Sequence, residues 1–192
     1  MMRKLTSLTL VVILGLALGG MLQGCGGDRG KALEYLENGD KAIAVSEKKS
    51  EALGGDTGTM FTDLYGALSS GKAPDVAAFA RNSAKMKTVV DEMIAKADIS
   101  KAWFTRISTL EDVPDYARYA GLKIKIIDAN VAGLKQLKTF VDEAGNKLAA
   151  KPFDLIAFQT FVTGFGDSIQ KQGEESGKLQ KQASDLKKEK GL

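Results

Sequence analysis

The sequence predicts an all-α protein, an antiparallel helical bundle of about five to six helices with a long C-terminal helix. Three observations support this prediction. Apolar residues recur at alternating spacings of three and four, which places them on one face of a helix. All three prolines precede such a stretch, where a fixed φ favours the first helical turn. No convincing strand-like alternation of apolar and polar residues occurs along the chain.

The apolar spacing divides the chain into six amphipathic stretches. We expect helices at about 30–52, 59–70, 74–97, 100–111, 114–149 and 153–189. Residues 54–58 and 69–73 are expected to be loops, because both are rich in glycine or serine. The glycines at 54–58 follow no strand and lack the lysine of a phosphate loop, so we interpret them as a linker between helices.

Three apolar stripes carry this assignment. The clearest is Ala120, Ile124, Ile127, Val131, Leu134, Leu137, Val141, Ala144 and Leu148. The second is Val76, Phe79, Ser83, Met86, Val90, Met93 and Ala97. The third is Leu155, Phe158, Val162, Phe165 and Ile169, and its spacing continues through Gln172, Ser176, Leu179, Ala183 and Leu186. Stripes of this length predict helices that bury one face against their neighbours.

Helix starts have their own signals. Pro74, Pro114 and Pro152 each precede an aspartate by one or two residues, and a carboxylate in the first turn stabilises the helix dipole. The segments 74–80 and 114–120 resemble each other, which leaves a helical repeat open, although shared helix-start chemistry explains the likeness better. The spacing at 108–111 is that of a capping box and predicts a helix restart there.

The C-terminal segment 170–192 is polar, and glycines at 164, 166, 173 and 177 weaken the helix that leads into it. Gln172 and Ser176 stand at positions where the spacing calls for core residues. Two interpretations follow. The helix either outruns the bundle and frays, or its end binds a partner.

Composition excludes several classes of function. The chain has no histidine, which excludes Ser-His-Asp triads and histidine metal sites. Cys25 is the single cysteine, so disulfides and cysteine-bound zinc are excluded as well. Acidic pairs at 91–92, 142–143 and 174–175 are adjacent in sequence and therefore point about 100° apart on a helix. We predict no catalytic residue, no metal ligand and no cofactor, and the chain is not expected to be an enzyme.

Charge and aromatic content bear on possible ligands. The chain has 27 Lys and Arg against 24 Asp and Glu, which argues against nucleic acid as a partner. The aromatic residues are expected to be core or boundary residues. A cavity for an apolar ligand stays open as an alternative, and its expected lining is Trp103, Phe104, Phe158, Phe161 and Phe165.

The N-terminus has the plan of a secretory signal. Arg3 and Lys4 precede an apolar run over 5–18 that is too short for a membrane span. Leu22, Gln23, Gly24 and Cys25 follow this run. The arrangement resembles the lipobox of bacterial lipoproteins, with Gln23 in place of the usual small residue. The resemblance covers residues 1–25 and gives no information on the rest of the fold.

The resemblance implies cleavage between Gly24 and Cys25, recognition of residues 22–24 by the signal peptidase, and acyl chains on Cys25. We therefore expect a removed signal (1–24), a lipidated tether (25–30) and a single helical domain (31–192). Two or more acyl chains give stable membrane anchoring. Because Gly26 and not aspartate follows the cysteine, the resemblance favours the outer membrane with a periplasmic body.

These observations lead to an expected function. We expect a lipid-anchored, non-catalytic protein of the cell envelope that acts as a scaffold, adaptor or accessory binding subunit for an envelope protein. The alternative is a carrier that holds an apolar or amphiphilic ligand within the bundle. An enzyme built only from Asp, Glu, Lys, Ser and Tyr is the least favoured class, because nothing in the chain groups these residues into a site.

Overall fold

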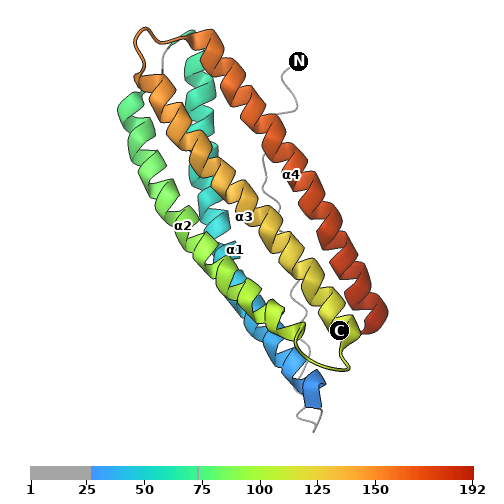
Figure 1. The fold of residues 1–192 in the computed structure, drawn as a ribbon. Coiled ribbons are helices and arrows are strands. Elements are labelled where there is room, and N and C mark those ends of the chain that lie inside the picture. The colour runs from blue at the N-terminus through green and yellow to red at the C-terminus, as the bar shows by residue number, and fades with distance from the viewer. Residues whose placement is uncertain (1–26, 73) are drawn as a thin grey trace.

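The described part of the chain folds into four long antiparallel helices (Figure 1). The structure, a computed structural model, describes residues 27–72 and 74–192. The helices are α1 (Gly27–Ser69), α2 (Val76–Ile107), α3 (Pro114–Ala149) and α4 (Leu155–Lys190). The predicted all-α antiparallel bundle with a long C-terminal helix is confirmed. The predicted number of five to six helices is wrong, because the described residues form four.

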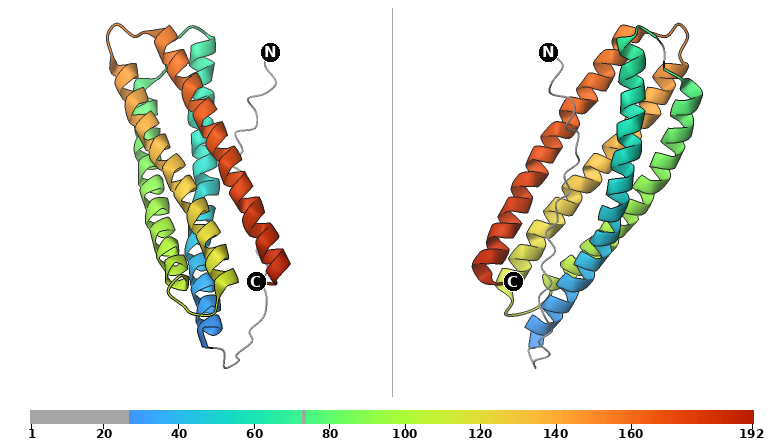
Figure 2. Two further views of the ribbon diagram at one scale, coloured as in Figure 1. Left: turned by 45° about the vertical axis from the view of Figure 1, so that its right-hand side comes forward. Right: turned by 180° about the vertical axis from the view of Figure 1, so that it is seen from behind.

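The four helices make an elongated rod (Figures 1 and 2). Each helix packs along the next one in the chain. The α1–α2 and α3–α4 loops lie at the upper end in Figure 1, whereas the start of α1, the α2–α3 loop and the end of α4 lie at the lower end. None of the helices in the described ranges is apolar enough over a sufficient length to cross a bilayer.

The buried core residues of α2 follow one regular spacing along the helix. The buried residues of α2 are spaced by four and three without a break: Phe79, Ser83, Met86, Val90, Met93, Ala97, Ser100, Phe104 and Ile107. This period of 3.5 residues is the repeat of coiled coils, in which the core seam stays turned toward the partner helix. The predicted stripe of α2 is therefore confirmed from Phe79 to Ala97 and extends to the end of the helix, whereas its first member, Val76, is exposed.

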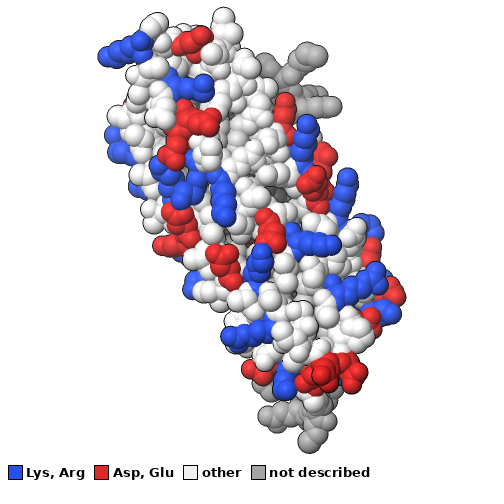
Figure 3. Space-filling view, in the orientation of Figure 1, with Lys and Arg blue, Asp and Glu red and all other residues white. Residues whose placement is uncertain are grey.

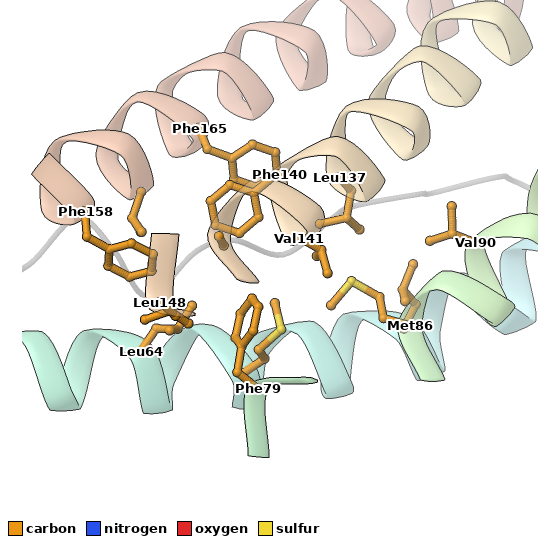
Figure 4. Close-up of a cluster of buried hydrophobic side chains, with 14 of the residues drawn as sticks. Leu64, Phe79, Met86, Val90, Leu137, Phe140, Val141, Leu148, Phe158 and Phe165 are labelled. Atoms are coloured by element: carbon orange, nitrogen blue, oxygen red, sulfur yellow. The ribbon is translucent and has the colours of Figure 1, made fainter. Parts of the chain in front are cut away.

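Two hydrophobic clusters fill the rod. In the upper cluster, the ring of Phe140 on α3 stacks on Phe165 of α4, with ring centroids 4.0 Å apart (Figure 4). The same ring stacks on Phe61 of α1 at 5.4 Å. The lower cluster surrounds the fully buried side chains of Phe104 and Ile107. Stacked rings at these distances add stability beyond the burial of their area, so Phe61, Phe140 and Phe165 hold α1, α3 and α4 together.

The predicted loop at 54–58 is wrong, because α1 runs through it as helix. The core positions Leu53 and Met60 on either side are buried in the upper cluster. Each glycine costs roughly 1 kcal/mol in a helix, and burial of a large apolar side chain contributes about 1.5–3 kcal/mol. Packing of the flanking residues therefore outweighs the glycine penalty.

Two further predicted breaks are absent from the described residues. The helix boundary expected between 97 and 100 lies inside α2, where Ala97 and Ser100 are successive core positions. The expected helix restart at 108–111 is a turn. The Ser108 hydroxyl donates back to the carbonyl of Thr105 at 2.7 Å, and the Glu111 N–H donates to Asp28 on α1. The capping-box spacing here marks the end of α2 and not a new helix.

The proline and aspartate signals are largely confirmed. Pro114 is the first residue of α3, as the sequence predicts. Asp75 and Asp154 precede α2 and α4 as N-caps, so they lie one step earlier than the predicted first-turn positions. The Asp75 carboxylate accepts from the N–H groups of Ala77 and Ala78, both at 2.9 Å. An N-cap carboxylate satisfies amides that the helix itself leaves unpaired.

Both ends of the predicted domain differ from expectation. Residues 27–30 of the predicted tether belong to α1, whose first turn is held by the contact between Asp28 and Glu111. The segment 170–192 does not outrun the bundle. Ala183 and Leu186 are buried in the lower cluster, and Lys190 forms an ion pair with Asp115 at the start of α3. The polar C-terminal half of α4 therefore lies along α3.

The close approach of α1 and α2 generates a stability prediction. A Cβ atom added at Gly39 would lie 2.6 Å from the ring of the fully buried Phe104. We expect Gly39→Ala to lower the free energy of unfolding by about 1–3 kcal/mol, because the ring has to shift. Gly55→Ala in the same helix meets nothing within 4 Å and should raise it by roughly 0.5–1 kcal/mol. Urea unfolding of both variants measures the difference, and equal stabilities would contradict the close approach.

Candidate functional site

The most unusual side chain of the interior is Lys123 on α3, which is 8% exposed. Its Nζ lies 2.8 Å from Oδ1 of Asp40 on α1. The same ammonium lies 5.5 Å from the ring centroid of Phe104 and 6.0 Å from that of Tyr119. A buried charge needs a partner of opposite sign, and here a carboxylate and two aromatic faces supply it.

Sequence reasoning missed Lys123, because the predicted stripe passes through Ile124. In the structure Lys123 is buried and Ile124 is half-buried. The spacing of three from Ala120 and of four to Ile127 was the available signal, since both neighbours are core positions. The predicted stripe therefore contains the adjacent apolar residue, Ile124, and not the lysine that occupies the core position.

Glu47 and Tyr119 lie in the same region. Burial raises the pKa of Glu47 above its ordinary value of 4.5, while Lys123 lowers it and the carboxylates of Asp40 and Glu51 raise it further. Burial, together with the charge of Asp40, raises the pKa of Tyr119 to about 12. We call Asp40, Glu47, Tyr119 and Lys123 the interior charge cluster. Tyr119 and Lys123 are buried, whereas Asp40 and Glu47 are half-buried, so the cluster extends from the interior of the rod to its surface.

A polar seam between α3 and α4 lies next to this cluster. The Ser176 hydroxyl donates to Oδ1 of Asn130 at 3.0 Å, and Gln136 donates to the hydroxyl of Ser168. Gln172 lies against Gly133, where a Cβ atom would be 2.9 Å from its Oε1. Of the two polar residues that the sequence places at core positions of α4, Ser176 bonds within the bundle, whereas Oε1 of Gln172 is buried without a hydrogen-bond partner among the described residues.

A groove of about 550 Å³ lies at the upper end, between the end of α1 and the start of α2. Its lining is Met60, Thr62, Asp63, Leu64, Gly66, Ala67, Pro74, Asp75, Ala78, Phe79 and Asn82. The floor is apolar, and the charged members of the lining are the two aspartates. Ligand pockets commonly have about 300–1,000 Å³, so its size suits a small molecule or a side-chain cluster.

The five aromatic residues expected to line one cavity are not brought together. Phe158, Phe161 and Phe165 belong to the upper cluster, whereas Phe104 lies in the lower one. Trp103 packs beside Tyr35 with ring centroids 5.8 Å apart, outside both. The predicted ligand cavity with this lining is wrong. The apolar repeat assigned each aromatic residue to the correct helix. It could not predict which residues of different helices lie at the same height along the rod.

The acidic pairs serve the packing of helices. Asp91 forms an ion pair with Lys138 on α3, whereas the adjacent Glu92 pairs with Lys49 on α1. The two carboxylates therefore point to different neighbours, as the helix geometry requires. The described residues hold no cluster of three or more possible metal-ligating side chains. On the face drawn in Figure 3, basic and acidic side chains lie side by side without a large area of one sign.

The predicted lipidation residue Cys25 and the recognition residues Leu22, Gln23 and Gly24 lie outside the described residues. The described chain begins at Gly27, two residues after the cysteine. Consecutive Cα atoms are about 3.8 Å apart, so the Cα atoms of Cys25 and Gly27 cannot be more than about 7 Å from each other. In the sequence, one residue, Gly26, separates Cys25 from the start of α1.

By the fold of its described residues, the protein is a four-helix bundle in which the buried Lys123 pairs with the half-buried Asp40. Residues 29–130 match the model of the family described as "CoA binding domain". The chain belongs to this family, since the match covers more than half of its 192 residues. No curated protein and no solved structure matches the chain.

The matched residues form α1, α2 and the first half of α3. CoA is a polyanion, so its phosphates require basic side chains or free helix N-termini. The groove within the matched range is lined by Asp63 and Asp75 and by no basic residue. The start of α2 is already capped by Asp75, and the first turn of α3 carries Asp115. The carboxylates in the groove and at the starts of α2 and α3 would repel the phosphates of CoA. The residues at these three places therefore do not fit CoA.

The interior charge cluster predicts a pH-dependent stability. The pKa of Glu47 is raised in the folded protein, so its contribution to stability falls as the pH rises from 4.5 through the raised value, and it is constant above that value. Glu47→Gln should therefore unfold at a higher temperature than the parent near pH 7, and the difference should shrink near pH 4. Thermal unfolding at both pH values tests this. A less stable variant near pH 7 would show that the attraction of Lys123 outweighs burial.

Proposed function

We propose that the protein is a lipid-anchored, non-catalytic component of the bacterial cell envelope that acts as a scaffold, adaptor or accessory binding subunit. The lipobox resemblance at residues 22–25 supplies the anchor. Acyl chains on Cys25 would hold the body at a membrane surface without a membrane-spanning helix. The favoured location is the outer membrane, with the body in the periplasm.

The observation that carries this proposal is the firm attachment of the first helical turn. Oδ2 of Asp28 accepts from the Glu111 N–H at 2.7 Å, and the Arg29 side chain donates to the Tyr116 hydroxyl at 3.2 Å. An anchor at Cys25 would therefore be coupled to a stiff body and not to a long flexible tether. Confinement of such a body to a surface raises its effective concentration toward other envelope components.

The length of the rod adds a geometric consequence. α1 has 43 residues, and at 1.5 Å per residue it is about 64 Å long. The start of α1 and the upper loops lie at opposite ends of the rod (Figure 2). An upright rod would present the upper loops and their groove far from the lipid, whereas a rod lying on the membrane would present one long side. Both arrangements suit an adaptor, because each fixes a binding surface at a set distance from the membrane.

The anchoring proposal predicts the behaviour of Cys25→Ser. This variant should leave the membrane fraction and become soluble in the envelope extract, since the acyl chains would have no attachment site. Far-ultraviolet circular dichroism should match that of the parent, because the described helices begin after this residue. Fractionation of cells that express each form measures the effect. Retention of the serine variant in the membrane fraction would contradict the anchor.

A carrier for an apolar or amphiphilic ligand is the second candidate, and the groove at the upper end favours it. Met60, Leu64 and Phe79 give the groove an apolar floor, and Asp63 and Asp75 give it a negative rim. This lining favours a neutral or cationic amphiphile over CoA, although the family description names CoA. Native mass spectrometry of the protein purified from membranes separates the candidates, because a carrier retains its ligand and an adaptor does not.

A further inference from the structure

One side of the α1–α2 pair combines aromatic, aliphatic and basic groups near the start of the described chain. Trp103 on α2 packs beside Tyr35 on α1, and the Arg106 guanidinium lies 4.2 Å from the Trp103 ring centroid. Cation–π contacts of this kind stabilise the ring and the charge together. Trp103 is the single tryptophan of the chain, and it is half-buried, so part of its ring reaches solvent.

Two of the large exposed apolar side chains lie on the same side. Val45 is 43% exposed and Ile99 is 46% exposed. The ion pair between Lys49 and Glu92 joins α1 and α2 along this side. Val45 is one turn before Lys49, and Ile99 is two turns after Glu92, so both face the same way as the ion pair. We call Tyr35, Val45, Ile99, Trp103 and Arg106 the α1–α2 outer face.

The charges around this face are mainly basic. Lys41 and Lys48 flank Val45 at helical spacings of four and three, and Lys96 precedes Ile99 by three. Glu37 pairs with Lys41 and Glu92 pairs with Lys49, and the other charges beside the face are Lys48, Lys96 and Arg106 against Glu34. A surface that mixes tryptophan and tyrosine with lysine and arginine matches the chemistry of a lipid headgroup layer, which is anionic on top and apolar below.

The position of the anchor brings this face to the membrane. Tyr35 is eight residues after Gly27, or about 12 Å along α1. Gly27 lies within about 7 Å of Cys25 in Cα distance. An anchor at Cys25 would therefore hold the lower end of the rod, where Tyr35 and Trp103 lie, near the bilayer.

We propose that the α1–α2 outer face lies on the membrane surface, with the exposed edge of Trp103 and the side chain of Ile99 inserted among anionic phospholipid headgroups. This inference rests on the proposed lipid anchor. It orients the rod along the membrane, with α1 and α2 toward the lipid and α3 and α4 toward the periplasm. Binding of the face should weaken at high salt, since salt screens the lysines and Arg106.

Fluorescence of Trp103 tests the proposal directly, because no other tryptophan contributes. The lipidated protein would be reconstituted in vesicles that contain phosphatidylglycerol and phosphatidylcholine with brominated acyl chains. We expect the emission of Trp103 to shift to the blue and to lose intensity relative to vesicles without bromine. A protein that stays on the vesicles while its emission is neither shifted nor quenched would overturn the proposal.

Matched variants separate the outer face from the anchor. Ile99→Asp should keep the protein on the vesicles, because the anchor is intact, but it should abolish most of the quenching. Ile156→Asp is the control, since Ile156 is 76% exposed and is the second residue of α4, which starts at the end of the rod opposite to the start of α1. Unchanged quenching in Ile99→Asp would also overturn the proposal. Loss of the unsubstituted protein from the vesicles would instead refute the lipid anchor.

Discussion

The structure depends on one packing constraint, the spacing of three and four between core positions, which is complete in α2. In α2 this register runs from Phe79 to Ile107 without interruption. Because the register is kept, Gly39 on α1 can lie against Phe104 on α2, and Gly133 on α3 against Gln172 on α4. These close contacts leave no space for a shift of one helix along its neighbour. The rod, its charged interior and its two ends all follow from this register.

The interior charge cluster also fixes how the helices are aligned along one another. Lys123 finds a carboxylate only where α3 lies beside Asp40 of α1, and a buried polar position is a known means of fixing register in helical bundles. The polar seam between α3 and α4 adds specific hydrogen bonds at Asn130 and Ser176. These side chains are used in contacts between the helices. The surface and the ends of the rod therefore remain as the places for function, and the proposed anchor and the outer face lie together there.

Sequence periodicity predicted the fold class, the positions of α3 and α4 and most core residues, because burial imposes the helical repeat directly on composition. It failed at 54–58, where local glycine propensity is overridden by tertiary packing of Leu53 and Met60. It also failed at Lys123, because a charge at a core position is recognisable only when its partner on another helix is known. For the same reason the aromatic residues were wrongly grouped. The lipidation site at Cys25 is a prediction from sequence motif alone.

The most direct test of this account is the length of α1, because a single helix through 54–58 sets the length of the rod and the separation of its two ends. Spin labels at Lys31→Cys and Ser69→Cys in a Cys25→Ser background give this length by pulsed electron paramagnetic resonance. A continuous helix places the two backbone positions about 57 Å apart, with a narrow distribution. A much shorter distance would show that the chain reverses at the glycines, and it would contradict the four-helix register.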